Sequence, residues 1–167
     1  MLIASTLLCC SKKNDSLPEP DIDEQNLTDC PAGFTCNYWY TDISTGPFFA
    51  ATDNNRVFYA RTATADTQTT LSFETSRALN SIVLTREDII NGKIKIDSSC
   101  PTCYFISYKL TGGFVKGKNL SGRTTRSSPS AKWLIEAKII RETFTTPAFV
   151  DSIYIKQYFY QKNSNGL

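Results

Sequence analysis

The chain has 167 residues, of which 41% are hydrophobic, 20% charged and 12% aromatic, and its formal net charge is +2. This composition suits one globular domain and excludes a chain that is disordered throughout. The small net charge gives no reason to expect nucleic acid as a partner. No apolar run is long enough to predict a membrane-spanning helix. The sequence contains no histidine, which excludes Ser-His-Asp triads, Cys-His dyads and His-ligated metal sites.

The N-terminal residues 1–8 are apolar or small, and they are followed by Cys9, Cys10 and a polar run. This pattern resembles the end of a bacterial lipoprotein signal peptide, in which an apolar stretch and a small residue precede the cysteine that receives a diacylglycerol. The resemblance implies a signal peptide over residues 1–9, cleavage before Cys10, and a lipid anchor on the Cys10 thiol in the bacterial cell envelope, at the outer membrane or cell surface. No Lys or Arg precedes the apolar stretch, which is consistent with a start further upstream.

Residues 10–29 form an acidic segment with two lysines against six acidic residues and with Pro18 and Pro20. Low hydrophobicity and high charge do not offset the entropy lost on ordering, so we expect a flexible tether. Residues 109–141, in contrast, carry eight basic residues and one acidic residue, Glu136. This asymmetry indicates either an acidic tail and a basic surface, or lysines that protect strand edges from pairing with other chains.

From residue 34 onward, apolar and polar residues alternate with a period of two in segments rich in β-branched and aromatic residues, which predicts strands. The predicted strands are residues 34–42, 56–62, 70–75, 81–86, 93–97, 104–110, 131–144 and 149–161. A helix is the alternative for 131–144. Thr85 is expected to cap one helical turn that ends at Asn91-Gly92, and the last strand is expected near the centre of a sheet.

These elements predict an all-β domain over residues 30–167. We expect an antiparallel β-sandwich of about eight or nine strands. The alternative is a lipocalin-like β-barrel, which would enclose a cavity for a ligand.

Four cysteines remain in the domain, and an even number in an exported chain predicts two disulfides. The simplest of three pairings joins Cys30 to Cys36 and Cys100 to Cys103. A redox pair at Cys100-Pro-Thr-Cys103 and a four-cysteine zinc site are weaker hypotheses, because a strand rather than a helix follows Cys103 and the Cys30–Cys36 spacing is unusual for zinc. We therefore predict neither a metal nor a cofactor.

Residues 112–119 match a phosphate-binding loop in part, but Asn119 replaces the required Ser or Thr and no helix follows. We interpret this stretch as a glycine-rich hairpin. Carboxylates are available for glycoside hydrolysis, but none lies in a motif that marks it as catalytic, so no catalytic residue is assigned.

Aromatic clusters provide the strongest functional indication, because rings on both faces of one strand are not all needed in a core. The candidate ligand-binding residues are Tyr38, Trp39, Tyr40, Tyr158 and Tyr160. We expect a non-catalytic module that binds a glycan or another envelope protein. The alternatives are a small carboxylate-dependent glycoside hydrolase and a β-barrel carrier of a small apolar ligand.

Overall fold

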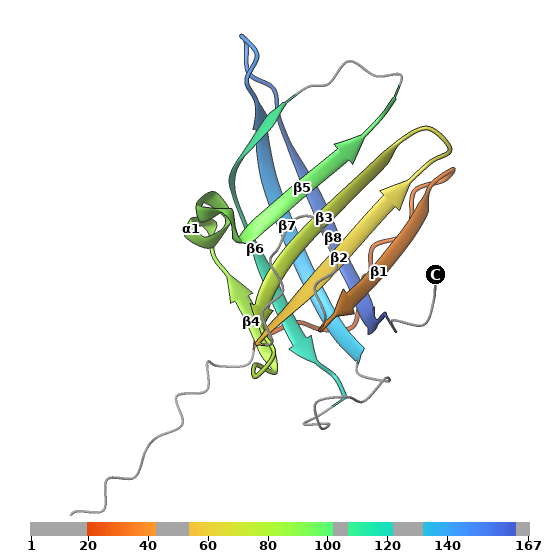
Figure 1. Ribbon diagram of the computed structural model, residues 1–167, viewed down its shortest axis with the longest axis vertical. Coiled ribbons are helices and arrows are strands. Elements are labelled where there is room, and N and C mark those ends of the chain that lie inside the picture. Colours follow the sequence, from red (N-terminus) through yellow and green to blue (C-terminus); the bar gives the residue numbers. More distant parts are fainter. Residues whose placement is uncertain (1–19, 43–53, 102–106, 122–131, 163–167) are drawn as a thin grey trace, which may run out of the picture.

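The computed structural model describes residues 20–42, 54–101, 107–121 and 132–162. Strands account for most of the described chain, and one short helical segment lies between the fourth and fifth strands (Figure 1). The strands are β1 (Thr35–Thr41), β2 (Asn55–Ala63), β3 (Gln68–Ser76), β4 (Ser81–Leu84), β5 (Ile94–Ser99), β6 (Tyr108–Asn119), β7 (Lys132–Thr143) and β8 (Val150–Gln161). The helical segment consists of α1 (Arg86–Asp88) and a wider turn, η1 (Ile89–Lys93).

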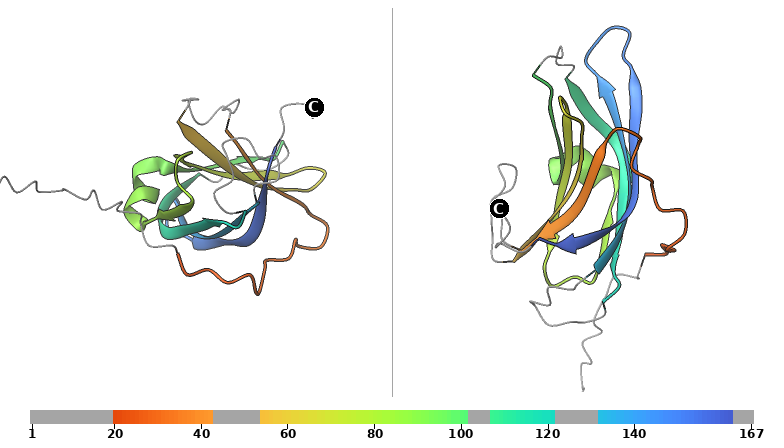
Figure 2. Two further views of the ribbon diagram at one scale, coloured as in Figure 1. Left: turned by 90° about the horizontal axis from the view of Figure 1, so that it is seen from below. Right: turned by 90° about the vertical axis from the view of Figure 1, so that its right-hand side faces the viewer.

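The eight strands form one mixed sheet in the order β4-β6-β7-β8-β1-β2-β3-β5. Neighbouring strands are antiparallel except β1 and β8, which run parallel. The sheet curls into a half-barrel whose two halves face each other across the core (Figure 2). The all-β prediction is confirmed. Two separate sheets, as in a sandwich, are not observed, because the β1–β8 pairing makes the sheet continuous, and the barrel alternative is closer to this shape.

The concave face of the half-barrel carries the core, as the alternation along each strand requires. Phe58 from β2, Trp133 from β7 and Phe159 from β8 are each at most 1% exposed. The Phe58 ring centroid lies 5.3 Å from that of Trp133 and 5.9 Å from that of Phe159, both edge-on, which is a favoured aromatic geometry. On its other side Phe58 stacks on Phe73 of β3. These rings join both halves of the sheet into one hydrophobic core.

The helical segment begins and ends as its sequence predicts. Thr85 is the N-cap and forms a capping box with Asp88, whose carboxylate accepts a hydrogen bond from the Thr85 backbone N–H at 2.8 Å. Near the end of the segment, Gly92 has a φ of +83° that favours glycine, and β5 begins two residues later at Ile94. Its Ile89 side chain is 1% exposed and joins the core between the two halves.

The strand prediction for 131–144 is confirmed by β7, and β8 lies between β7 and β1, away from both sheet edges. The strand predicted over residues 104–110 is described only from Ser107, because residues 102–106 lie outside the described part of the chain. The prediction of a hairpin over residues 112–119 is wrong, since these residues continue β6.

Glycine in β6 marks close packing rather than a turn. A Cβ on Gly117 would lie 2.5 Å from Cδ1 of Ile135, and a Cβ on Gly113 would collide with the backbone carbonyl of Lys138. Gly113 also has a φ of +119°, next to an irregularity between Leu110 and Gly112 in the β6–β7 register. Glycine inside a strand is typical of bulges and of such close backbone approaches.

We predict that Gly113→Ala destabilises the protein by about 3 kcal/mol or more, because alanine adds both backbone strain and a clash with β7. Gly112→Ala is the matched control: its Cβ would meet only the Arg86 side chain, at 3.4 Å, and its cost should stay under about 1 kcal/mol. Urea unfolding followed by tryptophan fluorescence measures both. Equal stabilities of the two variants would contradict the assignment.

Candidate functional site

The outer face of the sheet carries three aromatic side chains side by side on adjacent strands. In the register of the sheet, Trp39 of β1 pairs with Tyr59 of β2 on one side and with Tyr160 of β8 on the other. The rings of Trp39 and Tyr59 are stacked, with centroids 5.2 Å apart and planes 11° apart. We call Tyr59, Trp39 and Tyr160 the aromatic row. The Lys162 ammonium group lies 5.4 Å from the Trp39 ring centroid and adds a positive charge beside it.

Exposure increases along the aromatic row. Tyr59 is 7% exposed, Trp39 is half-buried and Tyr160 is 53% exposed. Burial raises the pKa of Tyr59, so its hydroxyl group stays protonated at neutral pH. The row therefore has the exposed ring and hydroxyl group of Tyr160 at one end and the buried, supporting ring of Tyr59 at the other. Such amphipathic rings bind flat, partly apolar ligands without a charge requirement.

Two of the predicted ligand-binding tyrosines face the core instead. Tyr40 is 0% exposed, and the half-buried Tyr38 packs with its ring centroid 5.5 Å from that of Phe159. Burial raises the pKa of both hydroxyl groups. Adjacent residues of a strand point to opposite faces, so the cluster at residues 38–40 places only Trp39 on the outside. Tyr40 is therefore a core residue and is wrong as a ligand-binding candidate.

Tyr59 is not among the residues predicted from the sequence, although the pattern of β2 contains a signal for it. Val57 and Tyr59 alternate with Phe58 and Ala60 in β2, so the strand is apolar on both faces. Val57 and Tyr59 form a second, small apolar cluster with Trp39 on the outer face. Because β2 is apolar on both faces, its sequence indicates an apolar patch on the outer face. Only the pairing of β2 with β1 shows that Trp39 lies beside Tyr59 in this patch.

Residues 20–29, which we call the N-terminal strap, lie against the outer face of β8. Ile22 is 3% exposed, and Thr28 exchanges hydrogen bonds with Lys156: its N–H donates to the Lys156 carbonyl at 2.9 Å and its hydroxyl accepts from the Lys156 N–H at 2.8 Å. These residues are thus packed rather than flexible, unlike the expected tether. Residues 10–19 lie outside the described part of the chain.

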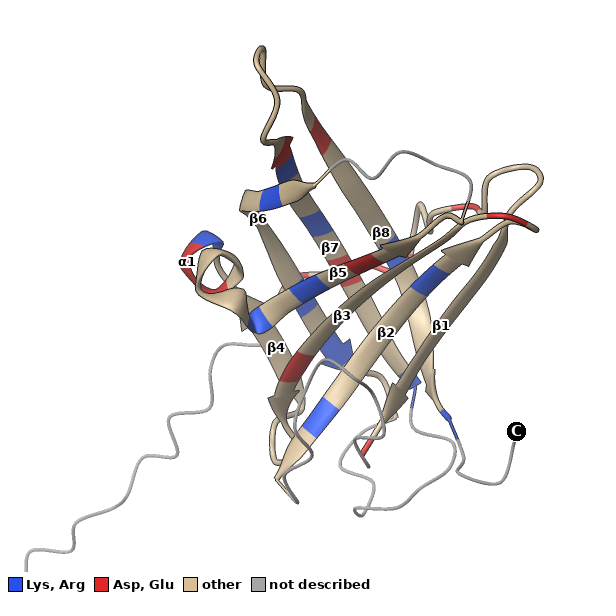
Figure 3. Cartoon of the chain, turned by 45° about the horizontal axis from the view of Figure 1, so that its top comes forward, with Lys and Arg blue, Asp and Glu red and all other residues tan. Residues whose placement is uncertain are grey.

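Ionic contacts hold the strap where its acidic residues meet the basic outer face. The Lys156 ammonium group donates to the Asp23 carboxylate at 2.5 Å, and the Tyr158 hydroxyl donates to Glu24 at 2.5 Å. The Lys132 ammonium group lies 3.4 Å from the Tyr158 ring centroid. Tyr158, a predicted ligand-binding residue, is therefore already engaged by the strap. Elsewhere basic and acidic residues are interspersed along the strands rather than gathered on one face (Figure 3).

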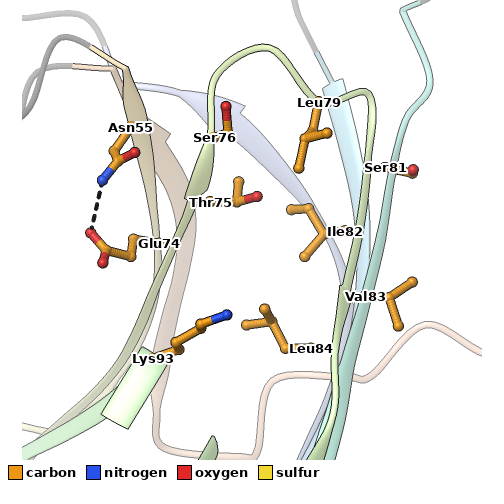
Figure 4. Close-up of a pocket in the computed structure, with 10 residues that line it drawn as sticks. All are labelled: Asn55, Glu74, Thr75, Ser76, Leu79, Ser81, Ile82, Val83, Leu84 and Lys93. Atoms are coloured by element: carbon orange, nitrogen blue, oxygen red, sulfur yellow. Dashed lines mark hydrogen bonds between the residues drawn. The ribbon is translucent and has the colours of Figure 1, made fainter. Parts of the chain in front are cut away.

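A pocket of about 310 Å³ opens between β3 and β4 (Figure 4). It is lined by one carboxylate and one ammonium group, from Glu74 and Lys93. The Glu74 carboxylate accepts a hydrogen bond from Asn55 Nδ2 at 3.3 Å, and Lys93 Nζ lies 2.6 Å from a carboxylate oxygen of Asp88. Both charged groups have protein partners, and the remaining lining is apolar or hydroxylated.

Two further carboxylates are held in ion pairs with arginine. The Arg56 guanidinium binds Asp42 at 2.7 Å, and the Arg141 guanidinium binds Asp151 through two hydrogen bonds of 2.6 and 2.8 Å. Each guanidinium also lies over an aromatic ring. The hydrogen bond from Asp151 raises the pKa of Arg141, which keeps this pair charged. Each ion pair joins two neighbouring elements of the sheet, so both carboxylates have a structural role.

The cysteines agree in part with the predicted disulfides. Cys30 and Cys36 are bonded, with their Cα atoms 5.7 Å apart. Cys100 is also disulfide-bonded, and Cys9, Cys10 and Cys103 lie outside the described residues. Among the described residues, no cluster of three or more acidic or cysteine side chains is arranged to hold a metal ion. No helix there has the length and apolar character needed to span a membrane.

Comparisons with protein-family models, with curated proteins and with solved structures yielded no significant match. The aromatic row, the strap and the pocket are therefore the features of this chain that bear on its function.

We predict that Asp23 titrates below its ordinary pKa of 3.8, because the hydrogen bond from Lys156 stabilises the carboxylate. The contribution of this contact to strap docking is therefore complete above pH 3.8 and is lost as the pH falls through the lowered value. Carboxyl NMR titration measures the midpoint. Lys156→Gln should return it toward 3.8, whereas Lys132→Gln, which removes the contact with Tyr158, should leave it unchanged. A midpoint that Lys156→Gln does not move would refute the contact.

Proposed function

We propose that the protein is a non-catalytic binding module of the bacterial cell envelope, anchored by a lipid on Cys10, and that its aromatic row binds a glycan. The observation that carries the binding function is the register of Tyr59, Trp39 and Tyr160 on three adjacent strands. Strands lie about 4.8 Å apart, so the row is roughly 10 Å long, which suits a short oligosaccharide.

The chemistry of the row favours a sugar over a charged or flexible ligand. The C–H face of a sugar ring is apolar, and its edge carries hydroxyl groups, so it complements a ring that has a polar tip. Tyr160 presents such a ring to solvent at 53% exposure, and the half-buried Trp39, whose ring is stacked on Tyr59, lies beside it. The stacked Tyr59 limits the freedom of the Trp39 side chain, which lowers the entropy lost when a ligand binds.

The two alternative functions have less support. A carrier of an apolar ligand needs an empty interior, whereas Phe58, Trp133 and Phe159 fill the half-barrel between its two walls. A glycoside hydrolase needs two carboxylates about 5–10 Å apart in a cleft. The pocket between β3 and β4 has Glu74 as its one lining carboxylate, and that group is hydrogen-bonded to Asn55.

The envelope location is inferred from the apolar stretch and small residue that precede Cys10 and from the disulfide between Cys30 and Cys36, which is typical of exported chains. Residues 10–19 connect the proposed anchor to the strap. Ten residues span at most about 35 Å, so the domain would remain close to the membrane that holds the lipid.

We expect Trp39→Ala and Tyr160→Ala each to weaken binding of the preferred glycan at least ten-fold. The measurement is isothermal titration with a panel of soluble oligosaccharides, including peptidoglycan fragments, together with tryptophan fluorescence. Tyr154→Ala is the matched control, because Tyr154 lies on the outer face of the same strand at 45% exposure but outside the row. Binding to none of the glycans, or equal losses in Tyr154→Ala and Tyr160→Ala, would overturn the glycan proposal.

Intact mass of the protein from a membrane fraction tests the anchor independently. The expected chain starts at Cys10, carries acyl mass and has no reactive thiol. Cys10→Ser should abolish the acyl mass and release the protein from the membrane fraction, whereas Cys9→Ser should leave both unchanged. An unprocessed chain with reactive thiols would contradict the envelope location.

A further inference from the structure

A fork between β3 and β4 leaves the edges of both strands open. The two strands follow each other in the chain, yet β3 pairs with β2 and β5 while β4 pairs with β6. The pairing of β5 with β3 stops at Phe73, because the chain before Ile94 belongs to the η1 turn. In the described part of the chain, no strand therefore pairs with the end of β3 or with the outer edge of β4.

The backbone groups that face this opening follow from the hydrogen bonds at the turn. The Asn80 carbonyl accepts from Asn119 of β6, so alternation directs the backbone groups of Ser81 and Val83 away from β6. In the same way, the N–H of Arg77 donates to Asn54 beside β2, so the backbone N–H of Ser76 points away from β2. The backbone groups of Ser81 and Val83 and the N–H of Ser76 are thus directed toward the open side, while the Ser76 carbonyl accepts a hydrogen bond from the Leu79 N–H at 3.2 Å.

The pocket of about 310 Å³ lies between these two edges. Thr75 from β3 and Ile82 and Leu84 from β4 point toward one another across it, while Val83 points away (Figure 4). Ile82 and Leu84 are 2% and 7% exposed, so the β4 side of the pocket is lined by buried, apolar side chains. The opening therefore has an apolar inner side, and among the described residues no strand pairs with either of the two edges that border it.

We propose that this opening is a strand-addition site, where an extended segment of a partner protein inserts between β3 and β4 and extends the sheet. Unpaired backbone N–H and C=O groups are strong and obligatory hydrogen-bonding groups, and an extended peptide is the ligand whose own backbone matches them at the strand repeat. β4 has four residues, so the matching segment has about the same length.

Side chains set a weak selectivity for this segment. A residue that faces the core would contact Thr75, Ile82 and Leu84, which favours Val, Ile or Thr there. Lys93 is paired with the Asp88 carboxylate, and Glu74 accepts a hydrogen bond from the neutral Asn55 amide, so the charge at the rim of the opening is that of Glu74. A segment whose central residues are uncharged and β-branched therefore fits, lysines at its ends are compatible with Glu74, and the main chain supplies most of the recognition.

The test uses a fluorescein-labelled heptapeptide, acetyl-Lys-Thr-Val-Thr-Val-Thr-Lys, whose binding is followed by fluorescence anisotropy. A second peptide has an N-methyl group on the central Thr, which removes a backbone donor and leaves the side chains unchanged. We expect saturable binding of the first peptide and at least ten-fold weaker binding of the second, because main-chain hydrogen bonds carry recognition in this mode. The amide NMR signals of Ser76 and Val83 should shift on binding.

The protein side is tested by Val83→Pro, which removes the N–H that faces the opening, with Val83→Thr as the control that keeps it. Val83→Pro should weaken binding at least ten-fold and Val83→Thr less than about two-fold, with unchanged thermal unfolding in both. Trp39→Ala should bind the peptide normally, which separates this proposal from the glycan site. Equal binding of the two peptides, undiminished binding by a folded Val83→Pro, or no binding of this peptide and of any member of a displayed heptapeptide library would overturn it.

Discussion

The parallel pairing of β1 with β8 is the contact on which the rest of the structure depends. It joins β2, β3 and β5 to β4, β6 and β7 in one sheet, whereas the remaining neighbours form antiparallel ladders. The junction lets the two halves curl over shared rings, with Phe58 from one half against Trp133 and Phe159 from the other. It also brings Trp39 beside Tyr160 on the outside, so one pairing creates both the core and the aromatic row.

The strap shows how the charge asymmetry of the sequence is used. Asp23 and Glu24 lie on Lys156 and Tyr158, so part of the acidic segment neutralises part of the basic outer face. Exposed ion pairs alone contribute little to stability. The buried Ile22 and the two hydrogen bonds between Thr28 and the Lys156 backbone explain better why the strap is packed. The charges then determine where it docks and reduce the positive charge of that face.

Two surfaces of different character result from one curved sheet. The aromatic row lies where the sheet is continuous, so its side chains have a fixed spacing and suit a flat ligand. The fork between β3 and β4 lies where the sheet is interrupted by α1 and η1, so backbone groups rather than side chains are presented there. In the proposed functions, recognition at the first surface depends on side-chain identity, and at the second on main-chain geometry.

The sequence by itself determined the local elements. Period-two alternation predicted strand for β7 despite some helical spacing, and Thr85 and Gly92 marked the two ends of the helical turn. The same alternation also implies that Tyr40 faces the core, because its neighbour Trp39 faces outward. The glycines of β6 were misread, since glycine in a sequence signals a turn as readily as a close approach, and only the position of β7 distinguishes the two.

Tertiary structure decided how the strands pair, and with it the site. Nothing local in β1 selects β8 as its parallel neighbour, because strand pairing over long separations depends on how both faces of the whole sheet are buried. The aromatic row, the fork between β3 and β4 and the docking of the strap all follow from that pairing. A pattern with a period of two specifies the face of the strand on which a side chain lies. The folded sheet alone determines which side chain of the next strand lies beside it.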